Sequence, residues 1–284
     1  MISVNDIQTG LDNKVPSSIA QVAIITKYTF IDYFRSRRFL VLAIITFLIG
    51  TLLTAAIGYY RPIGFTTNSL SFYGGWWGNI TTFVVILTGV FFGGDAISGE
   101  FQNKTGYFGI PNPIRRSSIY IGKWLAAFIA STIILGIFTA ITLGNGLYYF
   151  GLNVPYQFAE SVLFTWLYLI SVLGFTFFFS ALFKSSAMSI LVTVILFLFV
   201  FNIINLVVSS FAQVEPWFIL TYGAAIISSV FQVPYPPHTT TLNAGPMSFT
   251  TYAASIPEGI AIMALYFAVT IALGLALFER KEFT

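Results

Sequence analysis

The sequence predicts an all-α integral membrane protein, and composition is the first observation behind this fold class. Hydrophobic residues make up 57% of the 284 residues and only 8% are charged, whereas a soluble domain carries about 25% charged residues. A soluble fold of this size still exposes roughly a quarter of its unfolded area, so it could not remove this much apolar surface from water. The second observation is a set of six charge-free apolar stretches. The third is a strongly uneven distribution of Lys and Arg.

The six stretches are each long enough to cross a bilayer. A helix rises 1.5 Å per residue, so about 20 apolar residues span a hydrocarbon core of about 30 Å. Arg38 and Arg61 flank the first stretch, and the last begins with Ser255-Ile256-Pro257-Glu258, which predicts a capping box with proline in the first turn. The predicted transmembrane domain covers residues 39–284, with spans over residues 39–60, 72–94, 124–149, 161–183, 188–208 and 260–278.

Two further segments are predicted to lie at the membrane without crossing it. After an N-terminal tail over residues 1–16, apolar residues recur at three-four spacing from Ile19 to Phe34, which predicts an amphipathic interfacial helix over residues 17–38 in contact with lipid headgroups. Residues 217–231 are apolar but too short to cross. They predict a re-entrant or interfacial segment on the outer side before the last span, and a seventh span is the alternative.

The basic residues predict the orientation. With the N-terminus in the cytoplasm, twelve of the thirteen Lys and Arg residues lie on the inner side and Arg61 alone lies outside. This distribution follows the positive-inside rule and predicts that both termini are cytoplasmic. It also explains the basic net charge, so no nucleic-acid partner is expected. We expect a multi-pass protein of the plasma membrane.

The residue inventory excludes several kinds of site. The chain has no cysteine, and its single histidine, His238, excludes a zinc site with two histidines from one chain. No GxxxxGK[ST] motif is present, because Gly122-Lys123 lacks the earlier glycine and is followed by Trp124. The chain therefore has no P-loop with which to hydrolyse ATP. We expect no catalytic residue, metal or cofactor in this chain.

The predicted spans contain no ionisable side chain, and this counts against a transporter driven by protons or sodium ions. Asn202 and Asn205 are three residues apart and share a helix face. They form either a polar stripe along a transport pathway or hydrogen bonds between helices, and both readings stay open. Trp76, Trp77 and Trp217 are predicted to lie in an outer interfacial belt.

The loop between the second and third predicted spans is the longest inner loop. A solvated loop and a docking surface for a soluble partner are both consistent with its charges. It contains, in order, Gly99-Glu100, Thr105-Gly106, Pro113-Ile114-Arg115-Arg116 and Gly122-Lys123. This order of motifs, together with the segment Tyr33-Phe34-Arg35-Ser36-Arg37-Arg38 before the first span, resembles the permeases of type-2 ABC exporters, also called the ABC-2 type. The resemblance covers nearly the whole chain.

The resemblance implies that two permease chains form a pathway at their interface and that each docks a separate ABC ATPase subunit, which binds the ATP and Mg²⁺. The implied ATPase-coupling loop contains Glu100, Phe101, Thr105, Gly106, Arg115 and Arg116. The implied connecting helix contains Lys27, Arg35, Arg37 and Arg38, and the pathway would include Asn202 and Asn205.

The expected function is therefore the permease subunit of an ABC exporter, which is not itself an enzyme. It would work as a homodimer or heterodimer of permease chains powered by separate ATPases. The alternatives are an ATP-independent secondary transporter or channel, and a membrane anchor of a larger complex.

Overall fold

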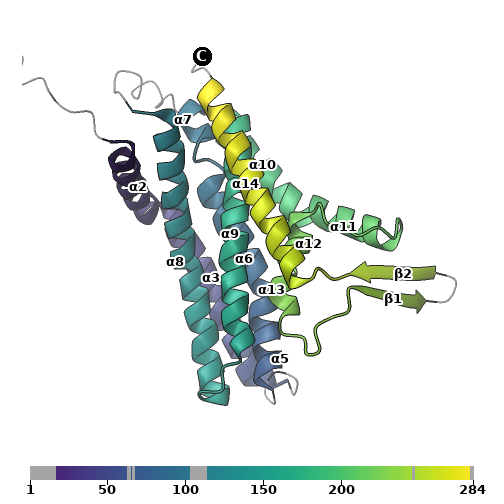
Figure 1. The fold of residues 1–284 in the computed structure, drawn as a ribbon. Coiled ribbons are helices and arrows are strands. Elements are labelled where there is room, and N and C mark those ends of the chain that lie inside the picture. The colour runs from purple at the N-terminus through teal and green to yellow at the C-terminus, as the bar shows by residue number, and fades with distance from the viewer. Residues whose placement is uncertain (1–16, 63–64, 66–67, 103–113, 245–246, 282–284) are drawn as a thin grey trace, which may run out of the picture.

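The computed structural model describes the chain except for residues 1–16, 63–64, 66–67, 103–113, 245–246 and 282–284. Its long helices lie side by side in one elongated bundle, and the shorter elements lie along its flanks (Figure 1). Six helices are long and apolar enough to cross a membrane: Arg37–Tyr60, Ser69–Gln102, Arg116–Phe150, Tyr156–Leu182, Ser186–Ser210 and Ile256–Arg280. The predicted all-α class with six spans is therefore confirmed.

Four of the spans are single continuous helices. They are α3 (Arg37–Tyr60), α8 (Arg116–Phe150), α9 (Tyr156–Leu182) and α14 (Ile256–Arg280). The start of α14 follows the predicted capping box, since the backbone N–H of Ser255 donates to Glu258 Oε2 at 3.1 Å and a proline occupies the first turn. A helix begins most sharply where its free N–H groups have such a partner.

The second and fifth spans each contain a π-helical turn. The second consists of α5 (Ser69–Tyr73), the π-helix η1 (Gly74–Gly78), α6 (Asn79–Gly93) and, after a turn, α7 (Ser98–Gln102). The fifth consists of α10 (Ser186–Ile195), the π-helix η3 (Leu196–Val200) and α11 (Phe201–Ser210). A π-turn widens the helix locally, and such turns are rare and frequently lie at functional sites.

The core lies where α9 packs between α6 and α14. Small residues allow the close approach: a Cβ atom added to Gly89 of α6 would lie 2.6 Å from Val172 Cγ1 of α9. Trp76 and Trp77 are also in this core, at 1% and 0% exposure, and the Trp77 Nε1–H donates to Ser161 Oγ at 2.9 Å. The prediction that these two tryptophans lie at the outer interface is therefore wrong. Trp217 is 60% exposed.

Between the fifth and sixth spans, the chain forms two short helices and a hairpin. The helices α12 (Leu220–Ala224) and α13 (Ile226–Ser229) form one apolar segment that is too short to cross a membrane, as predicted for residues 217–231. In the antiparallel hairpin, β1 (Thr239–Ala244) pairs with β2 (Met247–Tyr252), and Thr239 lies opposite Tyr252. The sequence did not predict this hairpin, which projects from the side of the bundle (Figure 1).

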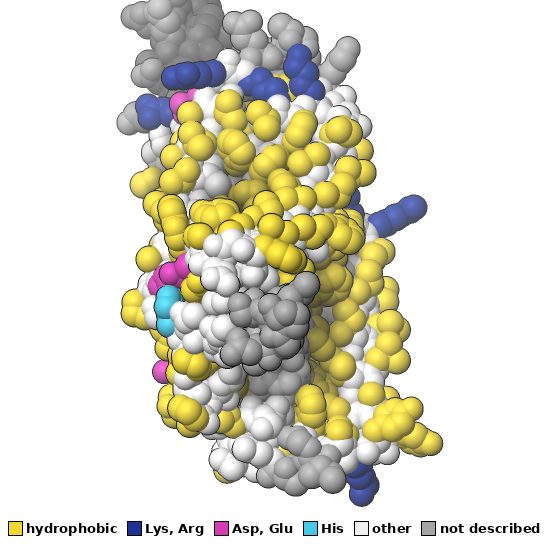
Figure 2. Space-filling view, turned by 90° about the vertical axis from the view of Figure 1, so that its right-hand side faces the viewer, with side chains coloured by type: hydrophobic (Ala, Val, Ile, Leu, Met, Phe, Trp, Pro, Cys, Tyr) yellow, Lys and Arg dark blue, Asp and Glu magenta, His cyan; other side chains and the backbone are white. Residues whose placement is uncertain are grey.

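Lys and Arg side chains gather at one end of the bundle, while hydrophobic side chains cover most of the flank below it (Figure 2). We call this the basic end. It contains the start of α8, α7 and the C-terminal end of α14 (Figure 1). The amphipathic helix α2 (Ser18–Arg35) lies along the flank of α8 close to this end.

Candidate functional site

At the basic end, α2 is fixed to the first turns of α8. The Gln21 side chain is 6% exposed, and its Oε1 accepts from the backbone N–H of Arg115 at 3.2 Å. The Thr26 hydroxyl lies 3.1 Å from the carbonyl oxygen of Gly122. A Cβ atom on Gly122 would lie 2.8 Å from Ile25 Cγ2, so the helices can touch here only because this residue is glycine. A displacement of α2 must therefore move the start of α8.

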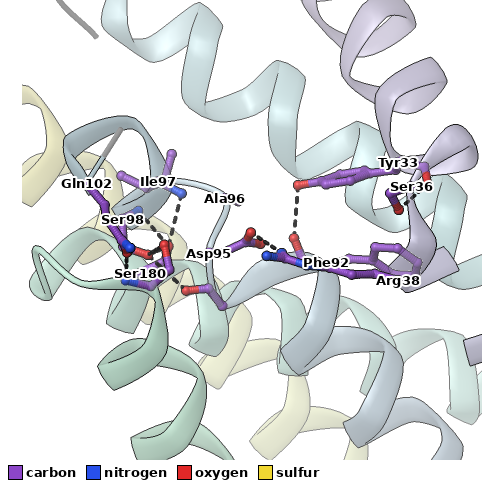
Figure 3. A network of polar contacts seen from close by, with 12 residues as sticks. Tyr33, Ser36, Arg38, Phe92, Asp95, Ala96, Ile97, Ser98, Gln102 and Ser180 are labelled. Atoms are coloured by element: carbon purple, nitrogen blue, oxygen red, sulfur yellow. Dashed lines mark hydrogen bonds and ion pairs between the residues drawn. The ribbon is translucent and has the colours of Figure 1, made fainter. Parts of the chain in front are cut away.

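The junction of α2 and α3 contacts the end of α6. Ser36 caps α3, since its Oγ accepts from the N–H of Phe39 at 3.2 Å. The Tyr33 hydroxyl donates to the carbonyl of Phe92 at 3.0 Å, and Arg38 forms an ion pair with Asp95 (Figure 3). Burial, followed by the nearby Asp95 carboxylate, raises the pKa of the Tyr33 hydroxyl above its ordinary value. The hydroxyl is protonated at neutral pH, as in any tyrosine, and the raised pKa extends its role as a donor to more alkaline pH.

The turn between α6 and α7 is held by a buried serine of α9. Ser180 Oγ accepts from the backbone N–H groups of Ile97 and Ser98, both at 3.0 Å (Figure 3). At the other end of α7, the Gln102 Oε1 accepts from the N–H of Ser186 at 2.9 Å. This connects α7 to the start of α10 as well. We call the unit formed by α2, the turn at Asp95, α7 and the start of α8 the elbow.

A cavity of about 400 Å³ lies inside the elbow, between α2, α7 and α8. Its lining residues include Thr29, Asp32, Asp95, Glu100 and Lys123. Lys123 forms an ion pair with Glu100 and donates to the carbonyl of Ala96 at 2.9 Å. Among the described residues that line the cavity, Lys123 is thus the one basic side chain, and it is paired with Glu100.

Two other basic residues cap helix ends. Arg116 Nη1 lies 3.0 Å from the carbonyl oxygen of Glu279 and 2.8 Å from that of Lys281, at the end of α14. Lys281 Nζ in turn donates to the carbonyls of Ala181 and Phe183 at the end of α9, at 2.9 and 3.0 Å. Burial, followed by the positive charge of Lys184, lowers the pKa of Lys281. These contacts join the ends of α8, α9 and α14.

The elbow brings together most of the residues that the sequence singled out. Glu100, Phe101 and Arg116 have partners within the chain; the Phe101 ring lies against Phe278 and below the Lys281 ammonium. Thr105 and Gly106 lie outside the described residues. Of the basic residues that the sequence singled out, Lys27 and Arg35 of α2 and Arg115 are exposed. Arg37 and Arg38 are also exposed, but they lie in α3 and not in the predicted interfacial helix, which ends at Arg35, and Arg38 is paired with Asp95.

Asn202 and Asn205 have different surroundings. Asn202 lines a cavity of about 320 Å³ between the second, fourth and fifth spans and the segment α12–α13. Its Nδ2 lies 3.0 Å from the carbonyl oxygen of Leu198, within the π-turn η3. Asn205 is outside this lining, and its Oδ1 accepts from the Ser209 hydroxyl at 3.1 Å. Sequence reasoning missed Tyr168 and Thr221 of the same cavity, because nothing local distinguishes them from other tyrosines and threonines in apolar helices.

On the flank of the bundle, beside the hairpin and the start of α14, three titratable residues meet (Figure 2). His238 Nε2 lies 3.3 Å from Glu215 Oε2, and ligand atoms of Glu215, His238 and Glu258 all lie within 4.8 Å of one another. The Tyr222 hydroxyl donates to Glu215 Oε1 at 2.7 Å. Hydrogen bonding to Glu258, supplemented by Tyr222 and His238, lowers the pKa of Glu215 against the effect of burial. This cluster joins the segment α12, the hairpin and the start of α14.

The structure is thus a bundle of membrane-spanning helices. At one end, hydrogen bonds and ion pairs fix the elbow to the spans, and a polar cavity lies between the spans. A comparison with curated proteins gives no match. The family model described as "ABC-2 family transporter protein" matches residues 23–283, which include α14 and most of α2. The match thus covers all six spans and most of the elbow. The chain therefore belongs to the ABC-2 family of transporter proteins and is a multi-pass membrane component of an ABC transporter.

Proposed function

We propose that this chain is the permease subunit of an ABC exporter, with the basic end in the cytoplasm and a separate ABC ATPase docked on the elbow. The positive-inside distribution supports this orientation in a plasma membrane. The observation that carries the proposal is that the elbow is joined to α3, α6, α8, α9 and α10 by the contacts described above. Export is the direction that the resemblance to type-2 exporter permeases favours.

The mechanical path from the elbow to the polar cavity is short. α6 runs without interruption from Asn79, which lines the cavity, to Gly93, next to the turn at Asp95. This is about 20 Å of helix at 1.5 Å per residue. Because α2 cannot move without the start of α8, and Arg38 pairs with Asp95, a force from an ATPase on α2 or α7 would reach the cavity wall through α6.

A second permease chain is a further proposed partner, and three spans have free apolar surface for it. Only 22% of the apolar windows of Arg37–Tyr60 and Ile256–Arg280, and 11% of that of Ser186–Ser210, is buried inside the bundle. By contrast, 67% of the window of Ser69–Gln102 is buried. The outer faces of these three spans are therefore available to lipid and to another permease, in a homodimer or heterodimer.

The first test is affinity purification from the native host in mild detergent, with mass spectrometry of the co-purified proteins. We expect an ABC ATPase subunit in a ratio near one to one. Its absence, under conditions that preserve a known ABC complex, would overturn the proposal and favour an ATP-independent transporter.

The second test locates the contact. Arg115 is exposed at the start of α8, so Arg115→Glu should weaken co-purification of the ATPase and uncouple ATP hydrolysis from transport. Arg61→Glu, which makes the same charge reversal at the opposite end of the bundle, is the matched control. Full ATPase recovery and full coupling with Arg115→Glu would contradict the assignment of the elbow.

A further inference from the structure

The cavity that contains Asn202 is unusual for the interior of a membrane bundle because much of its wall is polar. Its polar side chains are Asn79, Thr82, Tyr168, Asn202, Thr221 and Ser228. Among the described residues that line it, none carries a formal charge at neutral pH. The apolar part of the wall includes Phe83 and Ile86 of α6 and Phe197 of η3. The cavity thus offers hydrogen bonds next to apolar surface.

Two hydroxyl groups of this wall have no hydrogen-bond partner among the described residues. Tyr168 is 0% exposed, and its hydroxyl oxygen is buried and unpaired. The Thr221 Oγ1 is also buried and unpaired. Buried polar groups are nearly always paired in native proteins, because leaving one unpaired costs its full desolvation. Other buried hydroxyls of the described residues are also unpaired, but only Tyr168 and Thr221 among them line this cavity, so one molecule with hydrogen-bonding groups can reach both.

The backbone around the cavity is consistent with a binding site. Gly78, the last residue of η1, and Phe197 and Leu198 of η3 all line it, so the two π-turns of the chain's described residues meet at the same cavity. π-Turns are costly and often persist where a ligand binds. The second and fifth spans therefore both depart from α-helical geometry at this place.

We propose that this cavity binds the polar head of a neutral amphiphile, with the Tyr168 and Thr221 hydroxyls donating to its ester, amide or hydroxyl oxygen and its apolar body lying against Phe83 and Phe197. A charged head is disfavoured because the wall offers no opposite charge to offset its desolvation. This inference deepens the proposed transport function by naming the substrate class.

The test uses the full-length chain in lipid nanodiscs without an ATPase. The probe is a diacylglycerol with a diazirine near the glycerol, and the comparison probes are a diazirine phosphatidylglycerol and a diazirine alkane of similar length. We expect the diacylglycerol to label peptides containing Tyr168 or residues 197–202 in preference to both comparison probes. Tyr168→Phe should weaken this labelling about two- to tenfold, which is the range for loss of one hydrogen bond.

The matched control is Tyr120→Phe, since Tyr120 is also 0% exposed with an unpaired hydroxyl but lies outside this cavity. It should leave labelling unchanged. The inference is overturned if these peptides are not labelled, if the anionic probe or the alkane labels them equally, or if Tyr168→Phe has no effect. Because no ATPase is present, these results are independent of co-purification: a failed cavity leaves the permease assignment standing, and the reverse also holds.

Discussion

Replacing Ser180 by alanine should loosen the elbow while leaving the bundle folded. Ser180 is fully buried, and its Oγ is the acceptor for two backbone N–H groups, those of Ile97 and Ser98, which are themselves 0% exposed. Alanine removes the acceptor and leaves two buried donors. Each unpaired donor costs about 1–3 kcal/mol. Since the turn can relax in part, we expect the free energy of local opening at Ile97 and Ser98 to fall by about 2–4 kcal/mol.

Hydrogen exchange with mass spectrometry measures this opening directly. At 1.4 kcal/mol per factor of ten, the peptide containing Ile97 and Ser98 should exchange about 30- to 700-fold faster in Ser180→Ala. Ser131→Ala is the matched control, because Ser131 is equally buried but its Oγ has no partner among the described residues. Wild-type exchange at Ile97 and Ser98 in Ser180→Ala would refute the reasoning that this serine holds the turn.

Other substitutions test the packing and the ion pairs by thermal unfolding of the purified chain. Gly89→Ala should destabilise the α6–α9 contact by about 1–3 kcal/mol, whereas Gly136→Ala, whose Cβ would meet nothing within 4 Å, should not; equal effects would contradict the packing argument. Lys281→Met should lower the melting temperature, because several carbonyls at the end of α9 lose their donor. Arg38→Gln should cost more than the roughly 1 kcal/mol of an exposed pair, since it leaves the half-buried Asp95 unpaired; a smaller loss would show that the pair is unimportant.

The number of spans was predictable because a bilayer penalises every charge inside it, so charges mark the limits of each crossing. Charges mark the limits of a crossing and not the ends of its helix. α8 begins at Arg116, before the predicted crossing starts at residue 124, because a helix can continue past the hydrocarbon region into water. The order of motifs, through the family resemblance, predicted that Arg38, Glu100 and Arg115 belong to the regions that contact the ATPase. It did not predict the contacts of these regions with α9 and α14, because such contacts join residues far apart in the sequence.

The features that were not predicted from the sequence depend on packing between residues far apart in the chain. Trp76 and Trp77 have the composition of an interfacial belt, yet Ser161 and the aromatic rings around them place both in the core. The hairpin was missed because β1 and β2 are polar and short, and because such a hairpin needs packing against neighbouring elements for stability. Tyr168 has no local mark that separates it from Tyr120. Only the folded chain shows that one lines a cavity and the other does not.

Two adjacent arginines at the start of α8, Arg115 and Arg116, allow the stability of the fold and the binding of the ATPase to be tested separately. Arg116 donates to carbonyls at the end of α14, and hydrogen bonds from a charged donor contribute about 1.5–3 kcal/mol each. The Arg115 side chain is exposed, and among the described residues the contacts of Arg115 are made by its backbone, whose N–H donates to Gln21 and whose carbonyl accepts from Ser118 and Ile119. Arg116→Glu should therefore lower the melting temperature of the chain, whereas Arg115→Glu should leave it unchanged and weaken ATPase recovery.

The two variants introduce the same charge one residue apart, so a general electrostatic effect at the basic end would give them the same phenotype. Identical losses of stability, or identical losses of the ATPase, would contradict the division proposed for this surface. Distinct phenotypes would mean that the positive charges of this end do two separate things. Those with partners inside the chain, Arg38, Arg116, Lys123 and Lys281, hold the spans in register. Those left exposed, such as Arg115, recognise the subunit that drives them.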